Sequence, residues 1–246
     1  MPLPRFHLEH PLAPESRVAL PDAIAHHATR VLRLRDGDEL VLFDGGGGQY
    51  PAILELDGRA AWARTGRHDP REAELPGRVV LAQAIPAGDK MDWVVEKAVE
   101  VGAAEVQPLA AARSVLRLSG ERLDRRLLHW RRVAVAACEQ CGRNRVPHVA
   151  PPLTPAQWLA RDGAAPLRLF CDPDATVRMT DLLAGLPQPP AAVELLVGPE
   201  GGWAPEEYEL AGRHGVQAVR FGERILRTET AGTALISALS ARLGWI

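Results

Sequence analysis

The apolar residues of the last two thirds of the chain form short runs that alternate with helical repeats. Runs long enough for a buried strand and too short for a helix lie at residues 78–85, 105–111, 167–171, 193–197 and 216–221. The segments with helical spacing or helix-starting residues lie at 89–101, 121–142, 151–161, 180–186 and from about 204. This alternation of strands and helices predicts an α/β fold, with a mostly parallel sheet covered on both faces.

The helix expected over 89–101 has the clearest pattern of the set. Its inward positions are Met91, Val94, Val95, Ala98 and Val99. Gly102 follows directly and suits a helix C-terminus, because glycine readily adopts the left-handed conformation found there. The sequence therefore predicts both the buried face and the end of this helix.

The first 72 residues show a different pattern and predict a separate, mainly β module. Helical spacing runs over 22–32, with Asp22 as a plausible N-cap. Strands are expected at 39–44, 49–56 and 60–65, and four glycines form a hairpin between the first two. Pro51 in the middle strand would cost a ladder hydrogen bond unless it lies at an edge or a bulge.

A polar segment divides the two patterns. Residues 68–76 contain two prolines, Pro70 and Pro76, and Gly77 comes next, so this stretch reads as a linker. We therefore expect two domains, one over 1–72 and one over 73–246.

The composition is that of an ordinary globular protein of 246 residues, with 46% hydrophobic and 24% charged residues. No apolar run approaches the length of a transmembrane helix, and the N-terminus lacks the apolar region of a secretory signal. Three cysteines, an odd number, argue against a disulfide framework. Together these features lead us to expect a cytoplasmic protein with no membrane partner.

The charge is unevenly distributed along the chain. The formal net charge is −2, yet residues 113–145 hold nine arginines against three acidic residues, a local charge of +6. Such a segment can contact nucleic-acid phosphates, or it can simply be the solvated face of an amphipathic helix. Charge alone favours neither interpretation.

Two loops follow predicted strands of the second domain. The first is Gly198-Pro199-Glu200-Gly201-Gly202, and the second runs from Gly222 to Thr230 and enters a last helix. Loops at the carboxyl ends of strands are where α/β sheets bind ligands. The first loop is neither a phosphate-binding P-loop nor a dinucleotide fingerprint, because the required lysine and glycine spacings are absent from the sequence.

These loops resemble a known family. The first loop and Arg224-Ile225-Leu226-Arg227-Thr228-Glu229-Thr230-Ala231 closely resemble motifs of the bacterial 16S ribosomal RNA uracil-N3 methyltransferases, in the SPOUT superfamily. Further similar segments are Arg5-Phe6, Glu96-Lys97, Arg113-Ser114-Val115 and Glu139-Gln140 with Arg143. The family commonly has serine where this chain has Cys141. The resemblance spans nearly the whole chain.

The resemblance implies a fold, a reaction and partners. The fold would be a SPOUT-type methyltransferase domain with a parallel sheet and a C-terminal trefoil knot, preceded by a small PUA-like β-barrel domain. The protein would methylate N3 of a uridine, using S-adenosylmethionine and no metal. The substrate would be 16S ribosomal RNA or the small ribosomal subunit, and the enzyme would be a homodimer.

The resemblance also implies site residues. The cofactor would contact Leu196, Val197, Gly198, Pro199, Glu200, Gly201, Gly202, Gly222, Ile225, Leu226, Arg227, Thr228, Thr230 and Ala231. The catalytic residues would be Arg227 and Glu229. The RNA would contact Arg5, Arg30, Arg33, Lys90, Arg113, Arg143 and Arg145.

Methylation of N3 needs a general base, because this imide nitrogen is largely protonated at neutral pH. Glu200 and Glu229 are the two carboxylates on the loops, and Arg227 is a cation that could polarise a uracil oxygen. Other roles remain open. Glu229 could only favour a helix dipole, Glu200 could pair with the arginine-rich helix or bind ribose hydroxyls, and Arg227 could only position RNA.

Two rival functions remain open as well. One is another SPOUT RNA methyltransferase, which would act on a ribose 2′-hydroxyl or a tRNA base. The other is a non-catalytic RNA-binding protein of the ribosome. Cys138 and Cys141 have a metal-like spacing, but no second pair completes a zinc site, so we interpret them as helix packing.

Overall fold

The computed structural model describes residues 3–58, 60–115 and 119–246, which form two compact units. The first unit contains the residues up to 74 together with 138–146, and the second contains 75–137 and 147–246. The first unit thus ends two residues beyond the predicted boundary at 72. It also includes 138–146, which the sequence assigned to the second domain.

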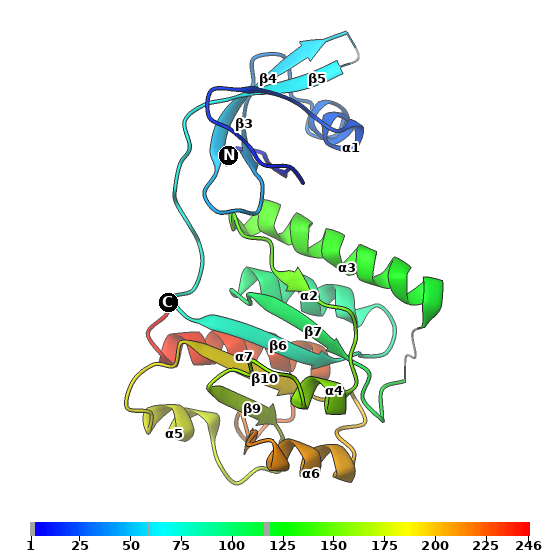
Figure 1. The fold of residues 1–246 in the computed structure, drawn as a ribbon, viewed down its shortest axis with the longest axis vertical. Helices are drawn as coiled ribbons and strands as arrows, with labels where there is room; N and C mark the ends of the chain where they lie inside the picture. The colour runs from blue at the N-terminus through cyan, green and yellow to red at the C-terminus, as the bar shows by residue number, and fades with distance from the viewer. Residues whose placement is uncertain (1–2, 59, 116–118) are drawn as a thin grey trace. The chain divides into compact units, whose positions relative to one another are not determined.

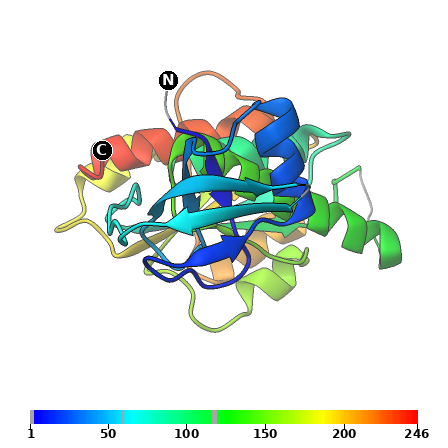
Figure 2. The same ribbon diagram turned by 90° about the horizontal axis from the view of Figure 1, so that it is seen from above.

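The first unit is built on a five-stranded sheet in the order β1-β3-β4-β5-β2. The strands are β1 (Arg5–His7), β2 (Arg17–Ala19), β3 (Glu39–Phe43), β4 (Tyr50–Asp57) and β5 (Ala60–Thr65). Strands β3, β4 and β5 confirm the prediction, and Figure 2 shows β4 and β5 as an antiparallel pair beside β2. The sequence missed β1 and β2, since three residues are too few to show alternation. These two edge strands do not pair with each other in the described part of the chain, where the resemblance implied a barrel.

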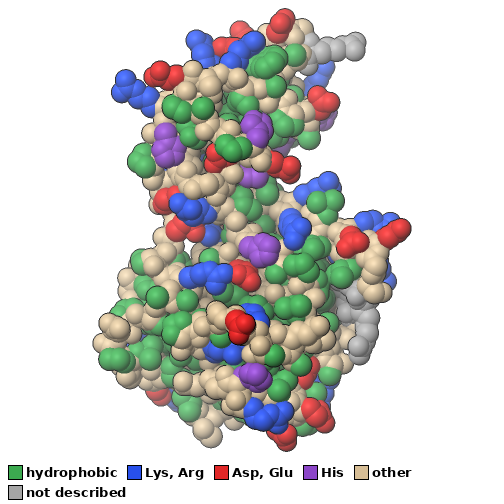
Figure 3. Space-filling view, viewed as in Figure 1, with side chains coloured by type: hydrophobic (Ala, Val, Ile, Leu, Met, Phe, Trp, Pro, Cys, Tyr) green, Lys and Arg blue, Asp and Glu red, His purple; other side chains and the backbone are tan. Residues whose placement is uncertain are grey.

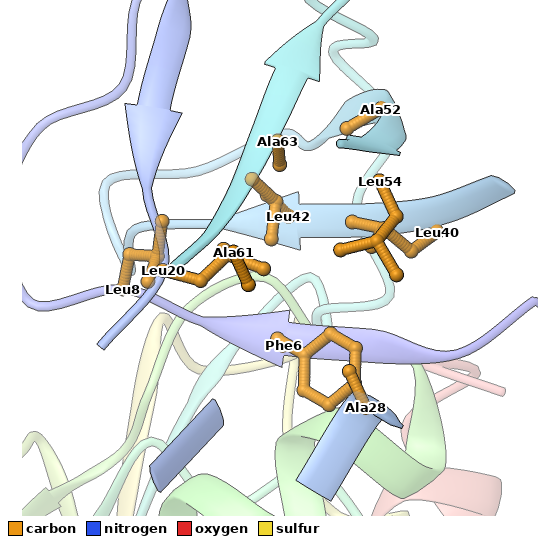
Figure 4. Packing of buried hydrophobic residues seen from close by; sticks show 10 residues of the cluster. All are labelled: Phe6, Leu8, Leu20, Ala28, Leu40, Leu42, Ala52, Leu54, Ala61 and Ala63. Carbon is orange, nitrogen blue, oxygen red and sulfur yellow. The ribbon is translucent and has the colours of Figure 1, made fainter. Parts of the chain in front are cut away.

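The core of this unit is made of alternate residues of its strands. Phe6 on β1, Leu40 and Leu42 on β3 and Leu54 on β4 are each at most 2% exposed. Figure 4 shows these side chains converging with those of Leu8, Leu20, Ala28, Ala52, Ala61 and Ala63. Full burial of a leucine or phenylalanine contributes roughly 1.5–3 kcal/mol, so this small cluster stabilises the unit.

The helix of the first unit differs from its prediction in two ways. It consists of α1 (Asp22–His26) followed by a π-helical turn, η1 (His27–Val31), in which the N–H of Leu32 donates to the carbonyl of His27. The prediction that Asp22 is the N-cap is wrong. Pro21 occupies the N-cap position without a side-chain cap, and Asp22 is the first helical residue. Its carboxylate still lies at the positive end of the helix dipole.

Pro51 lies in a central strand, not at an edge or a bulge as we expected. The N–H of Val41, its partner on β3, donates to Pro4 on the opposite side, so no β3–β4 hydrogen bond requires a donor from Pro51. On its other side Pro51 faces the end of β5, where its carbonyl accepts from Gly66 at 2.7 Å. The missing N–H therefore falls where the ladder has ended.

The second unit is built on a six-stranded parallel sheet in the order β11-β9-β10-β6-β7-β8. The strands are β6 (Arg78–Ala84), β7 (Glu105–Leu109), β8 (His148–Val149), β9 (Leu167–Cys171), β10 (Ala192–Val197) and β11 (Gln217–Val219). Almost every residue of β6 and β10 is buried, as expected for parallel strands covered on both faces. The α/β prediction is confirmed. The two-residue β8 was not predicted.

The helices of the second unit cover both faces of this sheet. They are α2 (Lys90–Glu100), α3 (Gly120–Cys141), α4 (Pro155–Leu159), α5 (Met179–Ala184), α6 (Pro205–Arg213) and α7 (Thr228–Arg242). The end of α3, from residue 138, belongs to the first unit. Figure 1 shows α4 and α6 in front of the sheet and α2 and α7 behind it. The predicted inward face of α2 is buried, and Gly102 beyond its end has φ +94°.

The last helix starts at the centre of the sheet, although the strand before it lies at an edge. After β11 the chain returns to the carboxyl ends of β6 and β10, where Thr228 begins α7. Leu235, Ile236 and Leu239 of α7 are at most 1% exposed. They therefore belong to the core of the unit, and only Leu243, Trp245 and Ile246 of the apolar end remain partly exposed. The knot implied by the resemblance stays a prediction.

A buried charge cluster stabilises the α4 side of the sheet. Glu194 on β10 is 1% exposed and accepts hydrogen bonds from Arg161, from Arg168 at 2.9 Å and from the N–H of Ala165 at 2.9 Å. Arg168 is itself only 8% exposed. Two guanidinium groups in a partly dry site therefore depend on one carboxylate.

We predict that Glu194→Gln lowers the free energy of unfolding by about 3 kcal/mol, because it leaves two arginines without their counter-charge. Urea unfolding at neutral pH measures the change. Glu209→Gln is the control, since Glu209 is exposed and pairs with Arg213 only at 3.8 Å. Equal stability of the two variants would show that the charge of Glu194 does not stabilise the fold.

Candidate functional site

One cavity opens at the carboxyl edge of the parallel sheet. Its volume is about 890 Å³, and the loops that follow β9, β10 and β11 surround it. The predicted cofactor residues 197–202, 225–228 and Ala231 line it, as do the predicted catalytic residues Arg227 and Glu229. Leu196, Gly222 and Thr230 lie outside its described lining. Leu196 is buried in its strand and Thr230 faces solvent.

The side chain of Thr228 joins the two predicted loops. Its Oγ1 donates to the carbonyl of Gly198 at 2.5 Å and accepts from Nε2 of Gln83 on β6 at 2.9 Å. Thr228 is 7% exposed and Gln83 is fully buried. The loop after β10, the start of α7 and the central strand β6 are therefore held together by one hydroxyl.

Two glycines of the first loop, which we call the glycine loop (198–202), leave little room for a side chain. A Cβ on Gly198 would lie 2.9 Å from Nε1 of Trp203, and one on Gly201 would lie 3.3 Å from the Cβ of Arg113. The guanidinium of Arg113 also donates to the carbonyl of Gly201 at 3.0 Å. The loop backbone is thus pressed against its neighbours and exposed to the cavity.

The carboxylate of Glu200 is held by α2 and the loop before it. Lys90 donates to Oε1 at 2.8 Å and the N–H of Ala87 donates at 3.1 Å. The suggestion that Glu200 pairs with the arginine-rich helix is therefore wrong. Burial works against the charged form, but the donors from Lys90 and Ala87 prevail and lower the pKa of Glu200. The same hydrogen bond raises the pKa of Lys90.

The two predicted catalytic residues start the last helix. Arg227 is the N-cap of α7 and is exposed, whereas the side chain of Glu229 is 16% exposed. Oε2 of Glu229 is buried, lies 3.6 Å from Nζ of Lys90, and has no hydrogen-bond partner in the described residues. A cation and a carboxylate two residues apart at the start of α7 therefore line the same cavity.

Sequence reasoning missed one wall of the cavity. Cys171 ends β9, Asp172 and Asp174 follow it, and Trp203 and Tyr208 contribute aromatic surface. The signal was present, because β9 is a strand of the same sheet and its carboxyl end must lie beside that of β10. Burial raises the pKa of Cys171 to about 11, which disfavours the reactive thiolate form.

The residues predicted to contact RNA fall into three groups. Lys90 and Arg113 line the cavity, whereas Arg30 and Arg33 are exposed on the first unit. The remaining three are Arg5, Arg143 and Arg145, which take part in contacts within the first unit. The predicted set is therefore divided between the two units, and three of its members make contacts within the first unit.

Arg5 and Arg143 are the most enclosed of these residues. Arg143 is 3% exposed and donates to both carboxylate oxygens of Glu74. Arg5 donates to Gln49 at 2.5 Å and to Asn144 at 2.6 Å. This placement argues for a structural role of the two side chains.

The cysteine pair lies in the same region. Cys138 is fully buried, contacts the carbonyl of Arg145 at 3.7 Å, and burial raises its pKa to about 12. Within the described ranges no three His, Cys, Asp or Glu side chains are grouped as metal ligands would be. Packing is therefore the role that the contacts of Cys138 support.

The surface offers little further indication of partners. On the face seen in Figure 3, lysine and arginine side chains lie among aspartate and glutamate rather than in one patch. In residues 3–58, 60–115 and 119–246, no helix combines the length and hydropathy needed to cross a bilayer.

Two family models match the chain. A model of an RNA methyltransferase domain matches residues 73–240, and a model of an RNA methyltransferase PUA domain matches residues 20–64. Among curated proteins, the chain is 37% identical over 232 residues to "Ribosomal RNA small subunit methyltransferase E" of Synechocystis sp., covering 93% of this chain and 74% of the relative. It is 31% identical to the protein of that name from Bacillus subtilis, covering 87% and 86%.

Solved structures similar to this chain are also methyltransferases. The chain is similar to a ribosomal RNA small subunit methyltransferase E of Neisseria gonorrhoeae bound to S-adenosyl methionine, with a TM-score of 0.89, 35% identity and 97% of each chain covered. It is also similar to a methyltransferase of Legionella pneumophila in complex with the cofactor SAM. That match has a TM-score of 0.90, 32% identity and 98% of each chain covered.

We predict that Thr228→Val loosens the glycine loop. Valine keeps the volume but removes the hydroxyl that donates to Gly198 and accepts from Gln83, and such a loss costs about 1–3 kcal/mol in a buried site. Hydrogen exchange should become faster at the amides of 201–203. Thr230→Val, at an exposed position two residues further on, is the control. Unchanged exchange in Thr228→Val would mean that the hydroxyl does not hold the loop.

Proposed function

The chain belongs to the RNA methyltransferase family, and from this membership we propose that it methylates N3 of a uridine in 16S ribosomal RNA of the small subunit. The relatives named above are small subunit ribosomal RNA methyltransferases. One observation in the chain itself carries the proposal. The hydrogen bond from Thr228 to Gly198 makes two loops the wall of one cavity, into which Arg227 and Glu229 both face.

The cavity suits S-adenosylmethionine as the cofactor. Its volume of about 890 Å³ is within the usual range for ligand pockets. The glycine loop brings backbone groups to the cavity wall, and the indole N–H of Trp203 has no acceptor in the described residues. A nucleoside ligand can supply that acceptor and receive backbone hydrogen bonds. When bound, the cofactor supplies its methyl group as an electrophile on sulfur.

The protein must supply proton transfer and charge stabilisation at the uracil. We assign the proton of N3 to Glu229, whose buried Oε2 has no hydrogen-bond donor among the described groups. We assign to Arg227, which lines the same cavity, the donor to a uracil oxygen, where negative charge collects as N3 loses its proton. Glu200 is the weaker candidate for the base, because Lys90 and Ala87 already donate to its carboxylate and lower its pKa.

The proposed partners follow from the resemblance and the exposed residues. The proposed phosphate contacts are Arg30 and Arg33, which are exposed on the first unit, and Arg113, which lines the cavity. The proposed assembly is a homodimer through the second unit. Ile246, 78% exposed at the end of the apolar C-terminal segment, is available for such a contact. The proposed location is the cytoplasm, where ribosomes are built.

We predict that the purified protein transfers labelled methyl groups from S-adenosylmethionine to small ribosomal subunits taken from cells that lack the enzyme. Subunits from cells that contain it should accept few methyl groups. Mass spectrometry of the digested RNA should find 3-methyluridine, and reverse transcriptase should stop there because N3 lies on the pairing edge. A 2′-O-methylated nucleoside or a modified tRNA would instead assign another reaction.

We predict that Glu229→Gln lowers kcat by about 100- to 10,000-fold, as expected for loss of a general base. Calorimetry should show that S-adenosylmethionine still binds. Glu206→Gln is the matched control, because Glu206 lies in the first turn of α6 and can only favour a helix dipole. Turnover in Glu229→Gln equal to that of the control would exclude Glu229 as the base.

A further inference from the structure

One ammonium group lies between the two carboxylates of the site. Lys90 begins α2, just beyond the carboxyl end of β6, and its Nζ lies 2.8 Å from Oε1 of Glu200 and 3.6 Å from Oε2 of Glu229. The two carboxylates come from different loops, one after β10 and one at the start of α7. A lysine has three N–H donors, so a single side chain can serve both.

The two carboxylates are not equivalent. Glu200 receives donors from both Lys90 and the N–H of Ala87, which fixes the glycine loop to the segment before α2. Glu229 has fewer partners. The 3.6 Å between its Oε2 and Nζ of Lys90 is beyond hydrogen-bond distance, and this buried oxygen has no other donor in the described residues. A buried acceptor without a donor is uncommon and calls for an explanation.

We propose that Lys90 is a positioning residue for methyl transfer. Its ammonium fixes the glycine loop through Glu200, and its charge holds the carboxylate of Glu229 at the cavity with one oxygen left to accept a proton. The inference rests on the proposed function, because that proton is the one on N3 of the uracil. In the transfer N3 gives its proton to the carboxylate of Glu229 and bonds the methyl carbon as the carbon–sulfur bond of the cofactor breaks, and Lys90 keeps all of its own protons.

The surroundings of Glu229 support this role. The charged groups that line the cavity with it include Lys90 on α2, Glu200 on the glycine loop and Arg227 at the start of α7. Arg227 is exposed, and in the proposed mechanism it serves the incoming substrate. In the part of the chain that the structure describes, Lys90 is the cation paired with Glu229, at 3.6 Å. Lys90 thus has a role within the site, where the sequence suggested an RNA contact.

The two roles of Lys90 predict different measurements. A lysine that contacts a phosphate contributes to RNA affinity. Its loss weakens RNA binding and makes the plot of the logarithm of the RNA-binding constant against the logarithm of the salt concentration less steep, by about 1. A positioning lysine contributes to the chemical step and to the loop. Its loss lowers kcat and weakens cofactor binding, while RNA affinity and the salt slope stay as they were.

The experiment compares Lys90→Met with Lys97→Met in the full-length protein. Lys97 is a matched control, because it lies on the same helix and also contacts two carboxylates, Glu96 and Glu100, but does not line the cavity. We expect Lys90→Met to lose about 100-fold in kcat and to bind S-adenosylmethionine several-fold more weakly. Its binding of a 16S RNA fragment at several salt concentrations should match that of Lys97→Met. Lys90→Arg, which keeps the charge, should recover much of kcat.

Three outcomes would overturn the inference. The first is that Lys90→Met keeps its kcat while its RNA binding depends less steeply on salt. The second is an equal kcat in Lys90→Met and Lys97→Met. The third is a kcat in Lys90→Arg as low as in Lys90→Met although both variants bind the cofactor. A general loss of folding would appear as a lower melting temperature than that of Lys97→Met, and the arginine variant then decides. Failure of the proposed function is distinguishable, because the unmodified protein would then form no 3-methyluridine.

Discussion

The hydroxyl of Thr228 is the point on which the site depends. It is bonded at once to the carbonyl of Gly198 and to the side chain of Gln83, so it fixes the glycine loop and the start of α7 to the buried strand β6. Without it the carbonyl of Gly198 would lose this donor and one N–H of the buried Gln83 amide would lose its acceptor, while the bond from that amide to the carbonyl of Ala84 would remain. The rigid sheet thereby determines the position of two loops that have little regular structure of their own.

The location of the cavity follows from the sheet. Parallel strands direct their carboxyl ends to one edge, so the loops after β9, β10 and β11 meet there although they are about 50 residues apart at the extremes. Glycine permits the close approach, because a Cβ on Gly198 would press on the indole of Trp203. The cavity is therefore lined by backbone on one side and by acidic and aromatic side chains on the other, an arrangement suited to a nucleoside ligand.

The charged side chains of this protein act mainly in local ion pairs, which the net charge of a segment does not reveal. The arginine-rich segment looks like one basic surface in the sequence, yet Arg143 is buried against Glu74 and Arg126 pairs with Asp89. The site uses its charges in the same way. Lys90 neutralises the anchored Glu200 while Glu229 keeps an oxygen without a donor, and this asymmetry distinguishes two carboxylates that the sequence could not rank.

The sequence by itself determined the α/β class, the inward face of α2 and the two loops, because periodicity and glycine placement are local properties. It also indicated which loop residues meet at the site, through the family resemblance of their motifs. Only the tertiary structure showed that Cys171 to Asp174 form a third wall, that Glu200 pairs with Lys90, and that Arg143 is enclosed. Those contacts form because the strand order and the position of α7 bring distant segments of the chain together. Contacts between residues far apart in the chain leave no periodic pattern in the sequence.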